Sequence, residues 1–148
     1  MTEAPDADRI LARRAAVVTI CEDAATSVID RVVLEASKAA NMFGLSPERA
    51  TRYGDSIKST LPTAFDAMKL ADGPARDAQI DDVARRVRAV TDSNHIPRIV
   101  ERGLVAIAYR VTREVIRRRA SQTAFSADEL EGEFVAFGER LERRLFDH

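Results

Sequence analysis

Few side chains in this 148-residue sequence are of the types that perform covalent chemistry. The histidines are His95 and His148, and the single cysteine is Cys21. A Cys–His nucleophile needs Cys21 beside a histidine, but Cys21 falls on the apolar stripe of its helix and is expected to be a small buried side chain. His148 is the last residue, where we expect disorder. No glycine-rich phosphate loop, Gly-x-Ser-x-Gly or Cys-x-x-Cys motif occurs, so the sequence predicts a protein that is not an enzyme.

The charged side chains follow patterns that are typical of helix surfaces. Carboxylates at 81–82 and 128–133 fall on helix faces that we expect to be exposed. Di-iron bundles carry Glu-x-x-His on two helices, and this motif is absent, so no metal is predicted. Arginines 117–119 could contact phosphate. They are better explained as cations at a helix C-terminus, facing the acidic last helix.

His95 is the residue that could bind a cofactor. It precedes two long final helices, as the haem-binding histidine of a globin-like fold does. Pro97 follows two residues later, so we place His95 in a loop or at an N-cap, where it caps or hydrogen-bonds the start of the next helix. Haem bound through His95 stays open as an alternative.

Composition favours one ordinary globular domain. Residues 1–148 are of single-domain length, with 1–5 expected to be a disordered tail. The net charge of -1 gives no electrostatic reason to expect nucleic-acid or membrane binding. The lone cysteine fits a reducing compartment, and no apolar run resembles a signal peptide or a membrane span. We therefore expect a cytoplasmic protein.

The first 40 residues show a long helical pattern. Apolar residues recur every seven positions from Leu11 to Val32. A straight helix of this length would exceed the expected diameter of a compact domain of this size. We therefore expect either a break near Thr26–Ser27 or a helix that projects into a partner. Gly44 is the expected C-terminal cap.

Shorter helices are predicted in the middle of the chain. Ser46 and Pro47 begin one, and Gly54–Asp55 is expected to end it. The next carries an apolar stripe that includes Phe65 and Met68, with Pro62 shifting its start or kinking it. A turn at 71–74 precedes a helix up to Val90, and 91–94 is expected to be a loop.

The last two helices should form an antiparallel pair. Pro97 begins a helix to about Ser121 whose middle, GLVAIAY, is apolar on every side and predicts a central buried helix. Ser126 and Glu129 form a capping box for the last helix. The two segments, 97–122 and 126–148, carry opposite net charges. No segment alternates with period two, so we predict an all-α bundle of about five to seven helices.

The stretch HIPRIVERGLVAIAYRVTREVI resembles the helical sensor domain at the N-terminus of RsbR-type stressosome proteins and of PucR/CdaR-like transcription regulators. The matching residues are Ile96–Pro97, which open the helix, and Ala108–Tyr109–Arg110 within it. The upstream SIKSTLPTAFDAMKLADG is similar to the amphipathic segment of that family. The likeness spans roughly residues 45–145. His95 is a departure, because the family prefers glycine there, and the 148 residues include no output domain.

This resemblance implies a globin-like bundle that usually lacks haem, forms a homodimer and passes a signal to a C-terminal output domain or a separate regulatory partner. We therefore predict a non-catalytic sensor domain linked to transcription regulation or stress response, which does not itself bind nucleic acid or membrane. A ligand pocket is predicted at Phe65, Met68, Ile107 and Tyr109. A haem-binding or apolar-ligand-binding globin-type sensor that uses His95 is the alternative. A TetR-like effector domain fits less well, because residues 1–45 predict one long helix.

Overall fold

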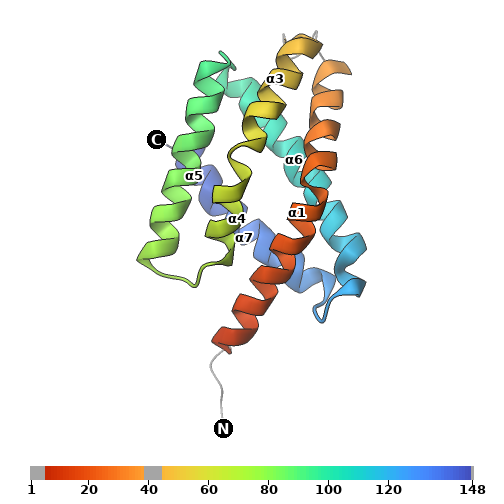
Figure 1. Cartoon of the computed structure of the whole chain (residues 1–148), viewed down its shortest axis with the longest axis vertical. Coiled ribbons are helices and arrows are strands. Elements are labelled where there is room, and N and C mark those ends of the chain that lie inside the picture. The colour runs from red at the N-terminus through yellow and green to blue at the C-terminus, as the bar shows by residue number, and fades with distance from the viewer. Residues whose placement is uncertain (1–5, 39–44, 148) are drawn as a thin grey trace.

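The computed structural model describes residues 6–38 and 45–147, and within them it contains six α-helices, one short 3-10 helix and no strand (Figure 1). This confirms the predicted all-α fold with a long N-terminal helix. The expectations for residues 1–5, Gly44 and His148 lie outside the described residues. The helices are α1 (Ala7–Lys38), α3 (Pro47–Lys58), α4 (Leu61–Lys69), α5 (Pro74–Ser93), α6 (Arg98–Arg119), η1 (Ala120–Gln122) and α7 (Ala127–Phe146).

Helix α1 is continuous through Thr26 and Ser27, so the expected break was wrong. Its 32 residues span about 48 Å at 1.5 Å each. The helix does not project away from the fold: its first half lies against α4 and α7, and its second half against α3 and α6 (Figure 1). Ion pairs mark this division, with Arg9 bound to Glu129 of α7 and Arg110 of α6 bound to Glu35. The bundle is elongated, which is why one long helix can be covered along its length.

Helix α3 continues through Gly54 and Asp55, where we had expected it to end. Gly54 lies where α3 crosses α1, and a Cβ atom built there would stand 2.6 Å from Cγ2 of Val33. The glycine therefore serves close helix packing rather than helix termination. Pro62 falls in the first turn of α4, which confirms that it shifts the start of that helix.

Helix α5 runs to Ser93, three residues beyond its predicted end, and His95 terminates it. His95 has φ 55°, the left-handed conformation that ends many helices. Its N–H donates to the carbonyl of Asp92, and the N–H of Ile96 donates to the carbonyl of Thr91, both at 3.0 Å. His95 therefore caps the end of α5 and not, as predicted, the start of α6.

The last two helices pack against each other as their charges predict. Arg113 binds Glu131 at 2.8 Å, and Arg117 binds both Glu131 and Asp128. The Ser126–Glu129 capping box is present at the start of α7. These exposed pairs contribute little free energy each, but they align the two helices.

Helix α6 is not surrounded on every side, which corrects our prediction of a central helix. Ala106, in the middle of the apolar stretch, is exposed, whereas the charged Glu101 is fully buried. The apolar core divides along the bundle. A lower cluster includes Val17, Ile80, Ile116 and Leu130, and an upper cluster includes Ala36, Leu45, Tyr53 and Leu104. None of the described helices is both long and apolar enough to cross a membrane.

Candidate functional site

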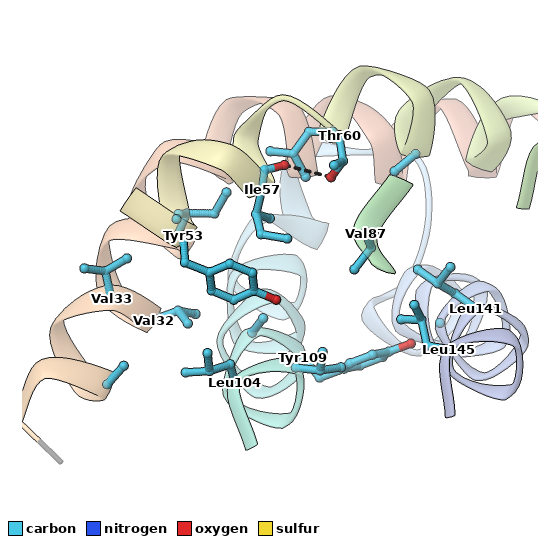
Figure 2. Close-up of a pocket in the computed structure, with 18 of the residues that line it drawn as sticks. Val32, Val33, Tyr53, Ile57, Thr60, Val87, Leu104, Tyr109, Leu141 and Leu145 are labelled. Carbon is cyan, nitrogen blue, oxygen red and sulfur yellow. Dashed lines mark hydrogen bonds between the residues drawn. The ribbon is translucent and has the colours of Figure 1, made fainter. Parts of the chain in front are cut away.

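A cavity of about 200 Å³ lies between the helices, and we call it the central cavity (Figure 2). All six α-helices contribute side chains to its wall, and every lining residue is buried or half-buried. Most of the wall is aliphatic, including Val33, Ile57, Val87, Leu104 and Leu141. An engineered apolar cavity of roughly 150 Å³ stays dry and binds benzene or xenon, so the central cavity is of a size and polarity that suit a small apolar molecule.

Small residues at the helix crossings explain why this space is not filled. Gly54 and Ala50 of α3, Ala64 of α4 and Ala108 of α6 all line the cavity. They have little or no side chain to extend into it. A larger side chain at Ala108, Ala64 or Ala50 would reduce the space, whereas one at Gly54 would first collide with Val33.

Two tyrosines, Tyr53 of α3 and Tyr109 of α6, bring hydroxyl groups to the cavity wall (Figure 2). The hydroxyl of Tyr53 lies 2.9 Å from Oγ1 of Thr91. Thr91 donates its single hydroxyl proton to Oε2 of Glu101, so in the first bond Tyr53 is the donor and Thr91 the acceptor. Burial, more than the nearby charge of Glu101, raises the pKa of Tyr53 to about 12.

A chain of polar groups, buried at Thr91 and Glu101 and half-buried at Arg88, continues from Tyr53 to the end of α7. Glu101 accepts a hydrogen bond from Nη1 of Arg88 at 3.0 Å. Arg88 also donates to the carbonyl of Leu145, which Arg98 reaches at 3.1 Å. The last carbonyls of a helix have no partners within the helix, and these arginines satisfy one of them. The cavity wall is thereby connected to the C-terminal end of α7.

Tyr109 differs from Tyr53 because its buried hydroxyl has no hydrogen-bond partner among the described residues. The ring packs against Phe134 with centroids 5.2 Å apart. The hydroxyl lies against Gly138 of α7, where even a Cβ atom would collide with it. Burial, together with the charges of Glu142 and Glu139, raises the pKa of Tyr109 well above its usual value. A buried hydroxyl without a partner is costly, and Tyr109 bears this cost at the wall of the central cavity.

Of the four predicted pocket residues, Tyr109 lines the central cavity and the other three do not. Met68 is buried in the lower core, with Phe65 packed against that core. Ile107 packs beside Val28 and Val111 between α1 and α6. The stripe on α4 faces the lower core, whereas residues 108 and 109 of α6 face the cavity. Sequence reasoning missed Tyr53 and Leu104, although both stand on apolar helix faces.

His95 is exposed and is not among the residues that line the cavity. Its backbone carbonyl accepts a hydrogen bond from Arg49 at 3.1 Å. An axial haem ligand must project into the pocket that holds the macrocycle, and His95 does not. The position of His95 therefore does not fit haem bound in this cavity.

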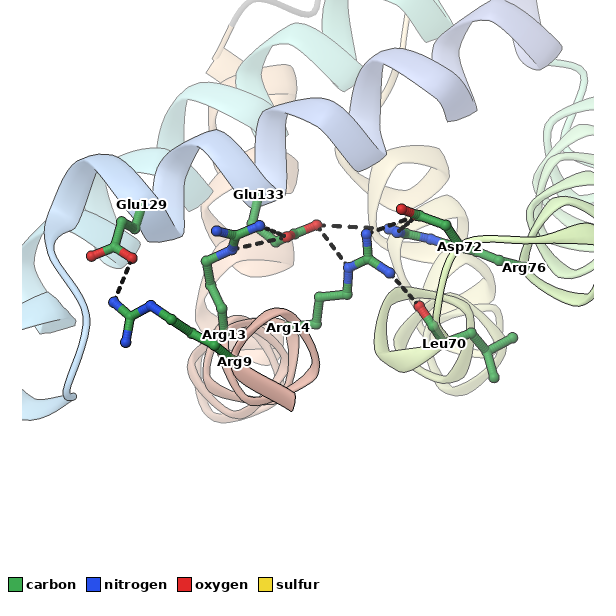
Figure 3. Close-up of polar contacts among 8 residues, drawn as sticks. All are labelled: Arg9, Arg13, Arg14, Leu70, Asp72, Arg76, Glu129 and Glu133. Atoms are coloured by element: carbon green, nitrogen blue, oxygen red, sulfur yellow. Dashed lines mark hydrogen bonds and ion pairs between the residues drawn. The ribbon is translucent and has the colours of Figure 1, made fainter. Parts of the chain in front are cut away.

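A second polar cluster, buried at Arg14, Arg76 and Glu133 and exposed at Asp72, joins the lower ends of α1, α5 and α7 (Figure 3). Glu133 accepts from Nη2 of Arg13 at 2.9 Å and from Nε of Arg14 at 3.1 Å. Arg14 also binds Asp72 at 2.8 Å, and Arg76 binds the same carboxylate at 3.2 Å. The guanidinium of Arg14 holds the pKa of Asp72 below its usual value. Both carboxylates, Glu133 and Asp72, accept hydrogen bonds from arginine side chains, so we assign the cluster a structural role.

Within residues 6–38 and 45–147, no group of three His, Cys, Asp or Glu side chains is placed to hold a metal ion. No family model, curated protein or solved structure matches this chain. The resemblance to the sensor domains therefore depends on the quoted motif residues. Of these, Ile96 is buried beside the cap of α5 and Tyr109 lines the central cavity.

Proposed function

We propose that this protein is a non-catalytic regulatory domain that binds a small apolar molecule in the central cavity. The observation that supports this most is the cavity itself, about 200 Å³ of apolar space inside the bundle. Unfilled apolar space between helices costs free energy because the atoms of its wall lack packing partners on one side. A ligand that fills the space restores part of that free energy and so stabilises the liganded conformation.

The buried polar chain supports a regulatory role for such binding. A ligand in the cavity contacts Tyr53, whose hydroxyl is bonded to Thr91 and through it to Glu101. Glu101 in turn holds Arg88, which binds the end of α7 at Leu145. A shift of Tyr53 therefore changes how the C-terminal end of α7 is held. This gives the cavity a physical route to an output domain or a partner protein.

The proposal includes a homodimer and a regulatory partner in the cytoplasm, acting in transcription regulation or stress response. The motif resemblance, carried by Ile96–Pro97 and Ala108–Tyr109–Arg110, supports this assembly. Light scattering on a sizing column measures the assembly directly: we expect the mass of a dimer, and a monomer at high concentration would exclude this part of the proposal.

Ligand binding is tested by titrating hexanol into the protein by calorimetry. Ala108→Leu fills the cavity, and Ala89→Leu, the same substitution at an exposed position of α5, is the matched control. We expect the wild-type protein and Ala89→Leu to bind hexanol with similar affinity and Ala108→Leu to bind it at least about tenfold more weakly. Equal binding by all three proteins would place hexanol elsewhere and contradict the proposed cavity function.

A further inference from the structure

Among the described residues, Glu142 is the one acidic side chain in the wall of the central cavity. It also lines a polar surface groove between α6 and α7, which we call the outer groove, together with Arg102, Ala106, Glu139, Arg143, Phe146 and Asp147. The half-buried Glu142 side chain therefore lies between the apolar space and the surface. A molecule that extends from the cavity to the outer groove must pass this carboxylate.

Among the described residues, the outer groove is lined by more acidic than basic side chains. It contains three acids, Glu139, Glu142 and Asp147, against two arginines. Arg102 already donates to the carbonyl of Phe146 at 3.5 Å and lies 4.9 Å from the centre of its ring. Neither Glu142 nor Glu139 takes part in an ion pair within the described parts of the chain, although most other acids of α7 do.

The unpartnered hydroxyl of Tyr109 belongs to a residue that, like Glu142, lines the central cavity. It is fully buried against Gly138, one helical turn before Glu142 on α7. The charges of Glu142 and Glu139 both act on it, because they help burial to raise the pKa of Tyr109. Tyr109, Gly138 and Glu142 all line the central cavity, so an unpartnered phenol oxygen and a carboxylate stand at the wall of the same apolar space.

We propose that the ligand of the central cavity is a small amphiphilic amine, with its apolar tail in the cavity and its ammonium group between Glu142 and Tyr109. An ammonium group carries three N–H donors, so it can donate hydrogen bonds to the carboxylate and to the tyrosine oxygen at the same time. An alcohol has one donor, and a carboxylate head group would be repelled by Glu142 and Glu139. The cavity volume of about 200 Å³ suits a tail the size of a short alkyl chain or one aromatic ring.

This inference rests on the proposed apolar-ligand function, and a matched set of probes separates the two. Hexylamine, hexanol and hexanoate share one tail and differ in head group. We expect hexylamine to bind at least roughly fivefold more tightly than hexanol, as a partly exposed ion pair allows, and hexanoate to bind most weakly. Raising the salt concentration should reduce the preference for the amine.

Glu142→Gln is the decisive variant, with Glu48→Gln as a control that removes one exposed charge outside both the cavity and the outer groove. We expect Glu142→Gln to lower the affinity for hexylamine to that for hexanol while hexanol binding stays unchanged, which also shows that the variant is folded. Glu48→Gln should keep the full preference. Equal binding of amine and alcohol by the wild-type protein, a preference that survives in Glu142→Gln, or tighter binding of hexanoate overturns the amine assignment. Failure of all three probes to bind overturns the proposed function as well.

Discussion

The hydroxyl oxygen of Tyr109 occupies the space where Gly138 would carry a side chain. A Cβ atom built on Gly138 would stand 1.1 Å from this oxygen and 2.0 Å from Cζ of the ring. Helices α6 and α7 are therefore fitted together through one tyrosine and one glycine, and this contact forms an edge of the central cavity. The contact also leaves the hydroxyl without a hydrogen-bond partner among the described residues.

Gly138→Ala should destabilise the protein by about 1–3 kcal/mol, the usual cost of overpacking a core. The reason is the collision with Tyr109, so the cost should fall sharply in a Tyr109→Leu background, where the colliding ring atoms are missing. Urea unfolding of the four proteins in this double-mutant cycle measures the coupling. An equal cost of the alanine in both backgrounds would show that Tyr109 does not explain the glycine.

Tyr53→Phe and Tyr109→Phe should change stability in opposite directions. Loss of the Tyr53 hydroxyl leaves Thr91 without its donor and should cost about 0.5–1.5 kcal/mol. Loss of the unpartnered Tyr109 hydroxyl removes a buried polar group without breaking a hydrogen bond, and should be neutral or stabilising by up to about 1 kcal/mol. Chemical unfolding of the two single variants checks both signs. A large loss of stability in Tyr109→Phe would mean that the hydroxyl has a partner.

His95→Gly should stabilise the protein by up to about 1 kcal/mol. An L-residue in the left-handed conformation is strained, and the gain from relieving that strain exceeds the entropy that glycine loses on folding. His95→Ala keeps the Cβ atom and is the matched control, for which we expect no gain. Thermal unfolding of both variants measures the difference, and equal melting temperatures would contradict the strain. Neither substitution should change the absorption spectrum after hemin is added, because His95 lies outside the cavity.

Stability should fall in alkaline solution as buried groups titrate. Burial raises the pKa of the Cys21 thiol from 9.0 to about 12, and Glu22 adds to the shift. Tyr53 is raised from 10.0 to about 12. The unfolded chain therefore releases these protons at lower pH than the native protein, so the stabilisation is complete below pH 9 and is lost as the pH rises towards 12.

The Cys21→Val variant separates the thiol from the tyrosines, because valine has a similar volume and no proton to lose. Urea unfolding midpoints across this alkaline window should fall less steeply for Cys21→Val than for the wild-type protein. Parallel slopes would show that Cys21 does not titrate differently in the folded and unfolded states.

Helix starts could be predicted from the sequence because their signals are local. Ser46 accepts a hydrogen bond from the N–H of Arg49, and Ser126 forms its capping box with Glu129 three residues later. Such hydrogen bonds join residues within one helical turn, so they can be predicted from the local sequence alone. The charge complementarity of α6 and α7 is also a property of composition.

Features that depend on other helices could not be predicted in the same way. Gly54 suggests a helix end until Val33 of α1 is known to lie against it. Glu101 suggests a surface residue until Thr91 and Arg88 are seen to surround it. The position of Glu101 in the first turn of α6 was the only local hint, and it is equally typical of an exposed acid.

The cavity is still harder to predict from the sequence, because it is an empty space whose wall is built from side chains of six different helices. Its only signal is a set of small residues on apolar helix faces, such as Ala108 and Gly138. The same residues are equally common where helices pack closely without a cavity. The side of α6 that faces the cavity depends on how the helix is rotated, which explains why Tyr109 lines the cavity and Ile107 does not.

A crystal of the protein exposed to xenon under pressure tests the central claim most directly, because xenon enters dry apolar cavities and is easily located by its scattering. We expect a xenon atom between Leu104, Val87 and Leu141 in the wild-type protein, and none at that position in Ala108→Leu. Ordered water filling the same space, or side chains closed over it with no xenon bound, would contradict the existence of an apolar binding cavity.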